Sequence, residues 1–156
     1  MPITLTKTTP DDLQFLYQIQ LDHDANQMAA FTSESGTDFS LYFEKYSKHL
    51  DDANISMWTI RLEQQIIGSV AKFVMAGENG ITYWIANEFW GQGIATDALM
   101  QLLQHEAVRP IYGYVAFDNA GSQRVLEKCG FRKIGSDKGF AKARQAEIEE
   151  FIYRLD

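Results

Sequence analysis

Trp90-Gly91-Gln92-Gly93-Ile94-Ala95-Thr96 is the stretch of sequence that decides the fold. It lies between a β-rich segment and a segment with the apolar spacing of a helix. Its two glycines allow the backbone to turn sharply and to present successive N–H groups. The first turn of the following helix adds unpaired N–H donors and the positive end of a helix dipole. The stretch is therefore either a tight turn and nothing more, or an anion-binding nest suited to a diphosphate.

Upstream of this loop, the sequence pattern changes from helical to β. Residues 3–7 alternate as a strand does, and Thr9-Pro10-Asp11-Asp12 is typical of a helix start. Apolar residues at helical spacing predict a first helix from Leu13 to Leu21 and a second around residues 39–46, with a loop at 33–37 between them. Residues 55–62, 66–75 and 81–86 are then strand-like and closely linked, with a strong turn signal at Gly77-Glu78-Asn79-Gly80. This region predicts an antiparallel meander.

Downstream of the loop, apolar residues at helical spacing predict a helix that ends by Val108-Arg109-Pro110. A buried strand follows at 111–117, and a short helix starts at Asn119 and closes at Gly130. Two strands are expected around 132–135 and 147–154, joined by a polar link over 136–146. The predicted order is β-α-α-β-β-β-α-β-α-β-β, which is an α/β (α+β) fold. Residues 1–156 are expected to form a single domain with a central mixed, mostly antiparallel sheet flanked by helices.

Composition limits the partners of the chain. Its 156 residues are 46% hydrophobic and carry a net charge of -7, which repels nucleic acid and anionic membrane surfaces and suits a cationic substrate, although solubility alone also explains it. A single cysteine, Cys129, permits no internal disulfide, and no signal peptide or membrane-spanning run is seen. We therefore expect a cytoplasmic protein, either a monomer or a homodimer.

A dinucleotide-binding motif is an alternative interpretation of the glycine loop. Gly91-x-Gly93-x-x-Thr96 matches two of its three glycines, and Asp118 at the end of the next strand suits a ribose. That motif, however, begins a βαβαβ fold, whereas a meander precedes this one, and too little chain follows Asp118 for the second half of such a sheet. A nucleotide-dependent oxidoreductase is therefore a weaker hypothesis.

Two motifs resemble one known family. Tyr83-Trp84-Ile85 followed by 89–99, and Asn119-Ala120-Gly121-Ser122 followed by Glu127-Lys128-Cys129-Gly130-Phe131, are similar to the GNAT superfamily of N-acetyltransferases. The resemblance covers nearly the whole chain and is greatest for the branch that contains the ribosomal-protein N-terminal acetyltransferases of bacteria. It implies an acyltransferase enzyme that moves an acetyl group from acetyl-CoA to a primary amine, such as a protein N-terminus or a small amine.

The resemblance also assigns residues to acetyl-CoA. The diphosphate is expected on the glycine loop and the pantetheine arm along the strand before it, while Asn119 is expected to contact the cosubstrate and to cap its helix. The residues so implied are Trp84, Ile85, Ala86, Asn87, Gln92, Gly93, Ile94, Ala95, Thr96 and Asn119.

The reaction needs an acid and a base. In this branch a serine three residues after the Asn is the usual candidate for protonating the CoA thiolate, so Ser122 is the expected acid, although it is equally well a solvated hydroxyl. The tyrosine that many relatives use instead is replaced here by Leu126. Backbone N–H groups near Ile85 are expected to stabilise the thioester oxygen.

The base is not fixed by the sequence. The strand glutamate found in relatives corresponds here to Gly80, which leaves Glu88, His23, Glu34 or a water relay. His49 and His105 are interpreted as surface groups, and Cys129 as a core residue. No metal site is expected, because no cluster has ligand spacing. Without the strand glutamate and the tyrosine, a non-catalytic acyl-CoA-binding or sensing domain is the main alternative.

Overall fold

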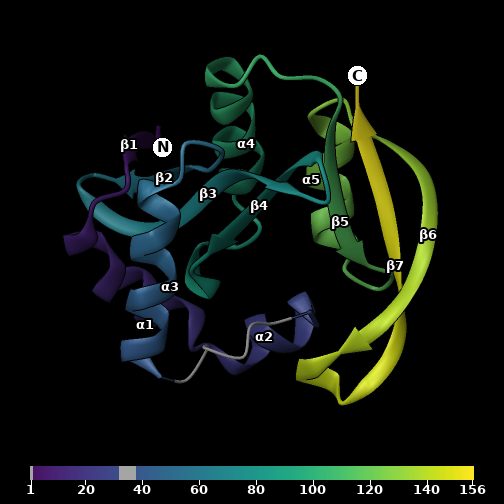
Figure 1. Cartoon of the computed structure of the whole chain (residues 1–156), viewed down its shortest axis with the longest axis horizontal. Helices are drawn as coiled ribbons and strands as arrows, with labels where there is room; N and C mark the ends of the chain where they lie inside the picture. Colours follow the sequence, from purple (N-terminus) through teal and green to yellow (C-terminus); the bar gives the residue numbers. More distant parts are fainter. Residues whose placement is uncertain (1, 32–37) are drawn as a thin grey trace.

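The computed structural model describes residues 2–31 and 38–156. A seven-stranded sheet runs through it in the order β1-β2-β3-β4-β5-β7-β6 (Figure 1). All neighbouring strands are antiparallel except β4 and β5. The strands are β1 (Thr4–Lys7), β2 (Ser56–Leu62), β3 (Gln65–Met75), β4 (Glu78–Ile85), β5 (Ile111–Ala116), β6 (Arg132–Ala141) and β7 (Ala146–Leu155). This architecture confirms the expected fold class.

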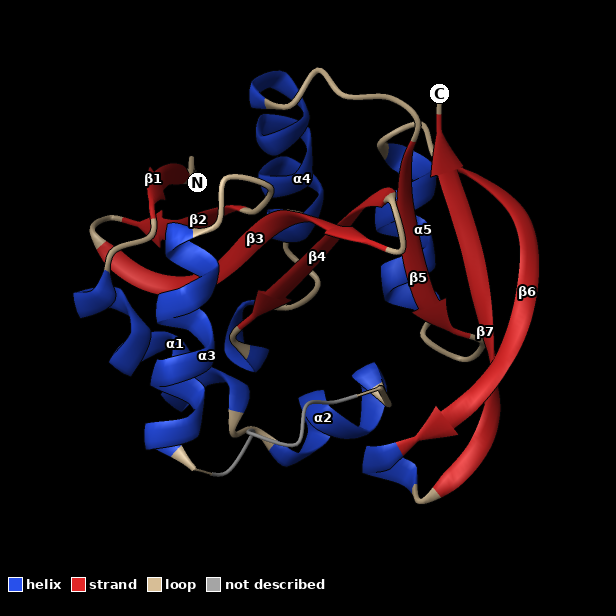
Figure 2. Cartoon of the chain, in the orientation of Figure 1, coloured by secondary structure: helices blue, strands red, loops and turns tan. Residues whose placement is uncertain are grey.

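Helices cover both faces of the sheet (Figure 2). The helices are α1 (Leu13–Gln20), α2 (His23–Ala29), α3 (Phe39–Asp51), α4 (Ile94–His105) and α5 (Ala120–Lys128). On one face, α4 and α5 pack through Leu99, Leu102 and Leu126 onto buried sheet residues such as Val70 and Ile81. On the other, α1 and α3 bury Leu13 and Tyr42 against β2 and β3. None of the helices within the described ranges is long and apolar enough to span a membrane.

The β3–β4 hairpin turns earlier than the sequence predicted. Met75 pairs with Glu78, so the loop consists of Ala76 and Gly77, whose φ angles of 53° and 79° fit the left-handed turn that such hairpins favour. Gly80, assigned to a turn from the sequence, lies inside β4. A Cβ atom there would approach the Phe73 ring to 2.7 Å, so a side chain at this position would require the ring to move.

The sheet divides where β4 meets β5. These strands pair only at Asn79 with Ile111 and at Gly80 with Tyr112, although β4 continues to Ile85. From there β5 diverges and pairs along its whole length with β7 (Figure 1). The second half of β4 consequently presents one edge to which β5 does not bond. This divergence creates the space for a site.

Two other details differ from the sequence-based order. A short helix, α2, lies between the two helices expected before β2, and it is capped by the Asp22 side chain, which accepts from Ala25 N at 2.9 Å. The polar link expected over 136–146 is mostly strand, because β6 pairs with β7 as far as Ala141 and Ala146. The expected loop at 33–37 lies outside the described residues.

Candidate active site

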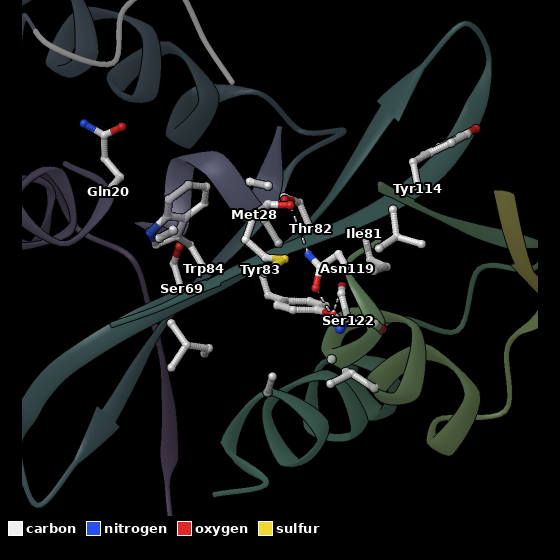
Figure 3. Close-up of a pocket in the computed structure, with 18 of the residues that line it drawn as sticks. Gln20, Met28, Ser69, Ile81, Thr82, Tyr83, Trp84, Tyr114, Asn119 and Ser122 are labelled. Carbon is white, nitrogen blue, oxygen red and sulfur yellow. Dashed lines mark hydrogen bonds between the residues drawn. The ribbon is translucent and has the colours of Figure 1, made fainter. Parts of the chain in front are cut away.

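A cavity of about 1170 Å³ occupies the divergence between β4 and β5. The glycine loop and the first turns of α4 and α5 line one side of it, and α1, α2, α3 and the β5–β7 pair line the other. Figure 3 shows Thr82 and Tyr83 of β4 beside Asn119 and Ser122 at the start of α5, with Met28 of α2 close to them. Trp84 of β4 and Gln20 of α1, which also line the cavity, lie farther from this group. The cavity therefore brings together segments from the whole length of the chain.

The glycine loop has the geometry expected of an anion nest. Gly91 and Gly93 have φ angles of 76° and 77°, and a Cβ atom at either position would meet open space. Gly93 caps α4, and its carbonyl accepts the first helical bond, from Asp97 N at 3.1 Å. The N–H groups of Ile94, Ala95 and Thr96 precede that bond and have no partner within the helix. All three residues line the cavity, so their donors are available to a ligand.

Trp90 fixes the loop to the end of β4. Its indole Nε1 donates to the Ile85 carbonyl at 2.8 Å. Trp84 and Ile85, the last residues of β4, line the cavity beside the edge to which β5 does not bond. The remaining residues assigned to acetyl-CoA, Ala86, Asn87 and Gln92, follow in the adjoining turns but are not among the cavity-lining residues.

Asn119, Ser122 and Tyr83 form a hydrogen-bonded group at the start of α5 (Figure 3). The Asn119 side chain caps the helix by accepting from Ser122 N at 3.2 Å, and its amide donates to the Met28 carbonyl at 3.5 Å. Tyr83 Oη and Ser122 Oγ share a hydrogen bond, and either atom can be its donor. All three residues line the cavity. Ser122 is thus placed at the site rather than in bulk solvent.

Sequence analysis missed Tyr83 as a functional residue. Burial raises the pKa of this phenol to about 12, more than the bond from Ser122 lowers it, so Tyr83 keeps its proton at neutral pH. The alternation of β4 could have predicted which way the Tyr83 side chain points. Ile81, Tyr83 and Ile85 alternate onto the same face of the sheet, which α4 and α5 cover. The sequence did not reveal that the ring reaches Ser122.

The candidate bases are placed away from the cavity lining. Glu88 is exposed in the turn after β4, and its carbonyl accepts from Gln92 Nε2 at 3.4 Å. His23 is exposed at the start of α2, and neither residue lines the cavity. Glu34 lies outside the described residues. The structure therefore provides no contact that supports Glu88 or His23 as the base.

The two other histidines and the cysteine have defined environments. His49 is not the surface group expected: it is half-buried, lines the cavity and packs edge-on against Tyr46 at 5.1 Å. Burial is the main cause that lowers its pKa, and Lys45 lowers it further while Asp52 raises it. His105 is exposed but stacks on Trp58 at 4.4 Å. Burial raises the pKa of Cys129 to about 11, which suits a core thiol rather than a nucleophile.

Comparison with known proteins identifies the family of this chain. The profile of the Acetyltransferase (GNAT) domain family matches residues 3–132. The chain belongs to the GNAT acetyltransferase family. The expectation of an acyltransferase enzyme and the family resemblance drawn from the two motifs are thereby confirmed. A sequence search of curated proteins finds no match.

Solved structures of GNAT proteins share the fold over nearly the whole chain. Ribosomal-protein-alanine N-acetyltransferase from Brucella melitensis superposes with a TM-score of 0.83 at 18% identity, covering 97% of this chain and 98% of its own. Mycobacterium smegmatis RimJ, in complex with CoA-disulfide, gives 0.80 at 22% identity, covering 98% and 81%. Spermidine N-acetyltransferase from Vibrio cholerae, in complex with CoA and spermine, gives 0.80 at 21% identity, covering 96% and 94%.

Among residues 2–31 and 38–156, no group of three or more His, Cys, Asp or Glu side chains is arranged to hold a metal ion.

Proposed function

We propose that residues 1–156 form a single N-acetyltransferase domain that moves an acetyl group from acetyl-CoA to a primary amine by direct attack. The observation that carries the proposal is the divergence of β4 from β5 directly beside the glycine loop. An unbonded strand edge can pair with the amide groups of a pantetheine arm, and the N-terminal donors of α4 can bind a diphosphate. Both features fit adjoining parts of one acetyl-CoA molecule, because its pantetheine arm is attached to its diphosphate. The related structures with bound CoA support this reading.

The residues assigned to acetyl-CoA divide into two groups under this proposal. Gly93, Ile94, Ala95 and Thr96 bind the diphosphate, with Gln92 at the entrance of the loop. Trp84 and Ile85 flank the pantetheine arm, and Ala86 and Asn87 continue its path toward the loop. Asn119 contacts the cosubstrate from α5 while it caps that helix.

Ser122 is the proposed acid. A neutral amine attacks the thioester carbon, the C–N bond forms, and the C–S bond breaks to release a thiolate. The Ser122 hydroxyl gives its proton to that sulfur, the Tyr83 hydroxyl replenishes it through their shared bond, and water returns a proton to Tyr83. Because Tyr83 remains protonated at neutral pH, the pair always has a proton available. The proton on the incoming amine leaves through water, since Glu88 and His23 do not line the cavity.

The acceptor is a protein N-terminus or a small amine. The relatives act on both classes, judging by ribosomal-protein-alanine N-acetyltransferase and spermidine N-acetyltransferase. A cytoplasmic location remains a prediction from the single cysteine.

Calorimetric titration with acetyl-CoA tests the proposal, followed by an assay of CoA release against a panel of peptide N-termini and small amines. Binding with turnover on one class of amine is the expected result. Binding without turnover on any of them would favour the non-catalytic acyl-CoA-binding alternative. An absence of binding would overturn the assignment of the cavity.

A further inference from the structure

The cavity has a second half that the chemistry of acetyl-CoA does not use. This half is the side lined by α1, α2, α3 and the β5–β7 pair. Among the described lining residues, only Asp118 and Glu150 carry a carboxylate. Their surroundings differ, and the difference points to what this half of the cavity binds.

Asp118 is already neutralised. Arg144 Nη1 and Nη2 donate to its two carboxylate oxygens at 2.6 and 2.8 Å. The bond from Arg144 is the main cause that lowers the pKa of Asp118. Arg144 Nε also donates to the Gln27 carbonyl at 2.8 Å, which ties the β6–β7 connection to α2. Arg144 thus connects these segments of the fold, and its ion pair leaves Asp118 little capacity to bind a ligand cation.

Glu150 has no such partner. It is half-buried on β7, and within the described part of the chain no hydrogen bond or ion pair reaches its carboxylate. Burial raises its pKa, and the neighbouring Asp137 on β6 raises it further. Burial is the main cause that raises the pKa of the Tyr114 phenol on β5, and Glu150 is among the nearby groups that raise it further. The side chain thus bears an anionic charge in an environment that disfavours it.

Sheet register places Glu150 away from Ser122. Gly113 faces α5, because a Cβ atom there would lie 2.8 Å from Leu126 Cδ2. Ala116, three residues further along β5, therefore faces the opposite way, and it packs in a cluster with Ala30 and Phe31 after α2. Glu150 pairs with Ala116 in the β5–β7 ladder and shares its face. Glu150 and Ser122 consequently lie on opposite faces of this part of the sheet, at two sides of one cavity.

This separation decides the role of the carboxylate. A carboxylate beside the reacting amine would hold the proton on its nitrogen, because a nearby anion stabilises the ammonium form. A carboxylate on the far side stabilises instead a second positive charge, one that does not react. A cation there would also remove the cost of burying Glu150 beside Asp137.

We propose that Glu150 binds a second cationic group of the acceptor, so that the enzyme selects amines that carry another positive charge beyond the one that is acetylated. This inference rests on the proposed function and names its substrate class, a diamine or polyamine. Glu150 acts as a specificity-determining residue, and the chemistry at Ser122 does not depend on it.

Putrescine and butylamine test the proposal, because they share a four-carbon chain and differ by one ammonium group. Their dissociation constants are measured by calorimetry on the protein saturated with CoA, so that no turnover occurs. The variants are Glu150→Gln and a matched control, Glu149→Gln, which makes the same change one residue earlier on the opposite face of β7. Glu149 is exposed, and its backbone carbonyl accepts from Phe117 N.

We expect the unaltered protein to bind putrescine about tenfold more tightly than butylamine, the effect of one partly buried charge-assisted contact. Glu150→Gln should abolish that preference and Glu149→Gln should keep it. Equal binding of the two amines, no binding of either, a preference that survives in Glu150→Gln, or its loss in both variants would each overturn the proposal. Failure of the proposed function would appear separately, as a failure of CoA itself to bind.

Discussion

At the scale of single residues, the proposed chemistry depends on two hydroxyl groups from distant parts of the chain. Ser122 comes from the start of α5 and Tyr83 from the middle of β4, and they meet at the cavity. Neither is charged at neutral pH, so their contribution is the delivery of a proton rather than an electrostatic field. Substitution of each hydroxyl can therefore test the mechanism without altering the net charge of the site.

Ser122→Ala should lower kcat by about a hundredfold, the lower range for loss of a general acid, and should leave the affinity for acetyl-CoA nearly unchanged. The α5 cap survives, because Asn119 bonds to the backbone N of residue 122 and not to its side chain. Steady-state kinetics with calorimetry on the same preparation separates the two quantities. Unchanged turnover on an accepted amine would remove Ser122 from the mechanism.

Tyr83→Phe should lower kcat by a smaller factor, about tenfold, because Ser122 can still give its own proton. Since the two hydroxyls act through one bond, the loss in the double variant should be smaller than the product of the single losses. Losses that multiply would show that the two hydroxyls act independently and would contradict the relay. Ser69→Ala, a hydroxyl removed elsewhere in the cavity lining, serves as the control.

Glu150→Gln should raise the stability of the free protein at neutral pH. The pKa of Glu150 is raised in the folded chain, so ionisation destabilises the fold as pH rises through the ordinary pKa of a glutamate. The gain in stability of Glu150→Gln should be absent in acid, where residue 150 is uncharged in both proteins. It should be complete at a pH above the raised pKa of Glu150. Urea denaturation over this pH range measures it, and a gain that does not depend on pH would contradict the explanation.

Sequence reasoning found the local features of the site and missed the contacts between distant segments. The Asn119 cap and the glycine loop depend on residues within one turn of each other, so their patterns are visible in the chain. The role of Tyr83 depends on its contact with Ser122 at the start of α5, and the role of Glu150 depends on the register between β5 and β7. A single sequence specifies neither of these contacts between distant segments. His49 was misplaced for the same reason, since its burial depends on how α3 packs.

At the scale of elements, the loop before α4 combines backbone strain with ligand binding. The φ angle of 77° at Gly93 disfavours any side chain, and the open space around it is where a diphosphate would lie. The loop consequently needs a positive φ at this position, and only glycine adopts it without strain. Variants here need a control that isolates the strain.

Gly93→Val should weaken acetyl-CoA binding by more than tenfold, since the side chain would project into the proposed diphosphate position. Gly77→Val is the matched control, because Gly77 has a φ of 79°, also has open space around it, and lies in the loop of the β3–β4 hairpin without lining the cavity. Thermal unfolding should show a similar loss of stability in both variants. Equal acetyl-CoA affinity in the two would refute the loop assignment.

The elements themselves were predicted best where pattern and packing agree. The α4 helix and the meander of β2, β3 and β4 have clear apolar periods because their faces are buried in one core. The second half of β6 was mistaken for a link, because an edge strand with exposed polar residues lacks that period. Its structure comes from pairing with β7.

At the scale of the whole molecule, the sheet consists of two ladders joined at two residue pairs. The first ladder extends from β1 to β4, and the second contains β5, β7 and β6. Helices α1 and α4 pack on the first, whereas α5 packs on the second. Acetyl-CoA bound along β4 and to Asn119 before α5 would link the first ladder to the second through α5.

Acetyl-CoA should therefore stabilise the entire fold. At one hundred times its dissociation constant it adds about 2.7 kcal/mol to the free energy of unfolding, which corresponds to a rise in Tm of about 5 to 10 °C for a chain of this size. Scanning calorimetry measures the shift. Acetate at the same concentration should produce none, and a shift of equal size with acetate would indicate a general solvent effect.

The divergence of β4 from β5 also has a consequence for the lifetime of the protein in a cell. Opening of the two ladders exposes backbone, which is what degradative proteases cleave. Acetyl-CoA bound as proposed would make this opening rarer and so slow the cleavage. When the concentration of acetyl-CoA falls, both the rate of the reaction and the amount of enzyme should decline. The divergence of β4 from β5 would then make the amount of active enzyme depend on the supply of acetyl-CoA in the cell.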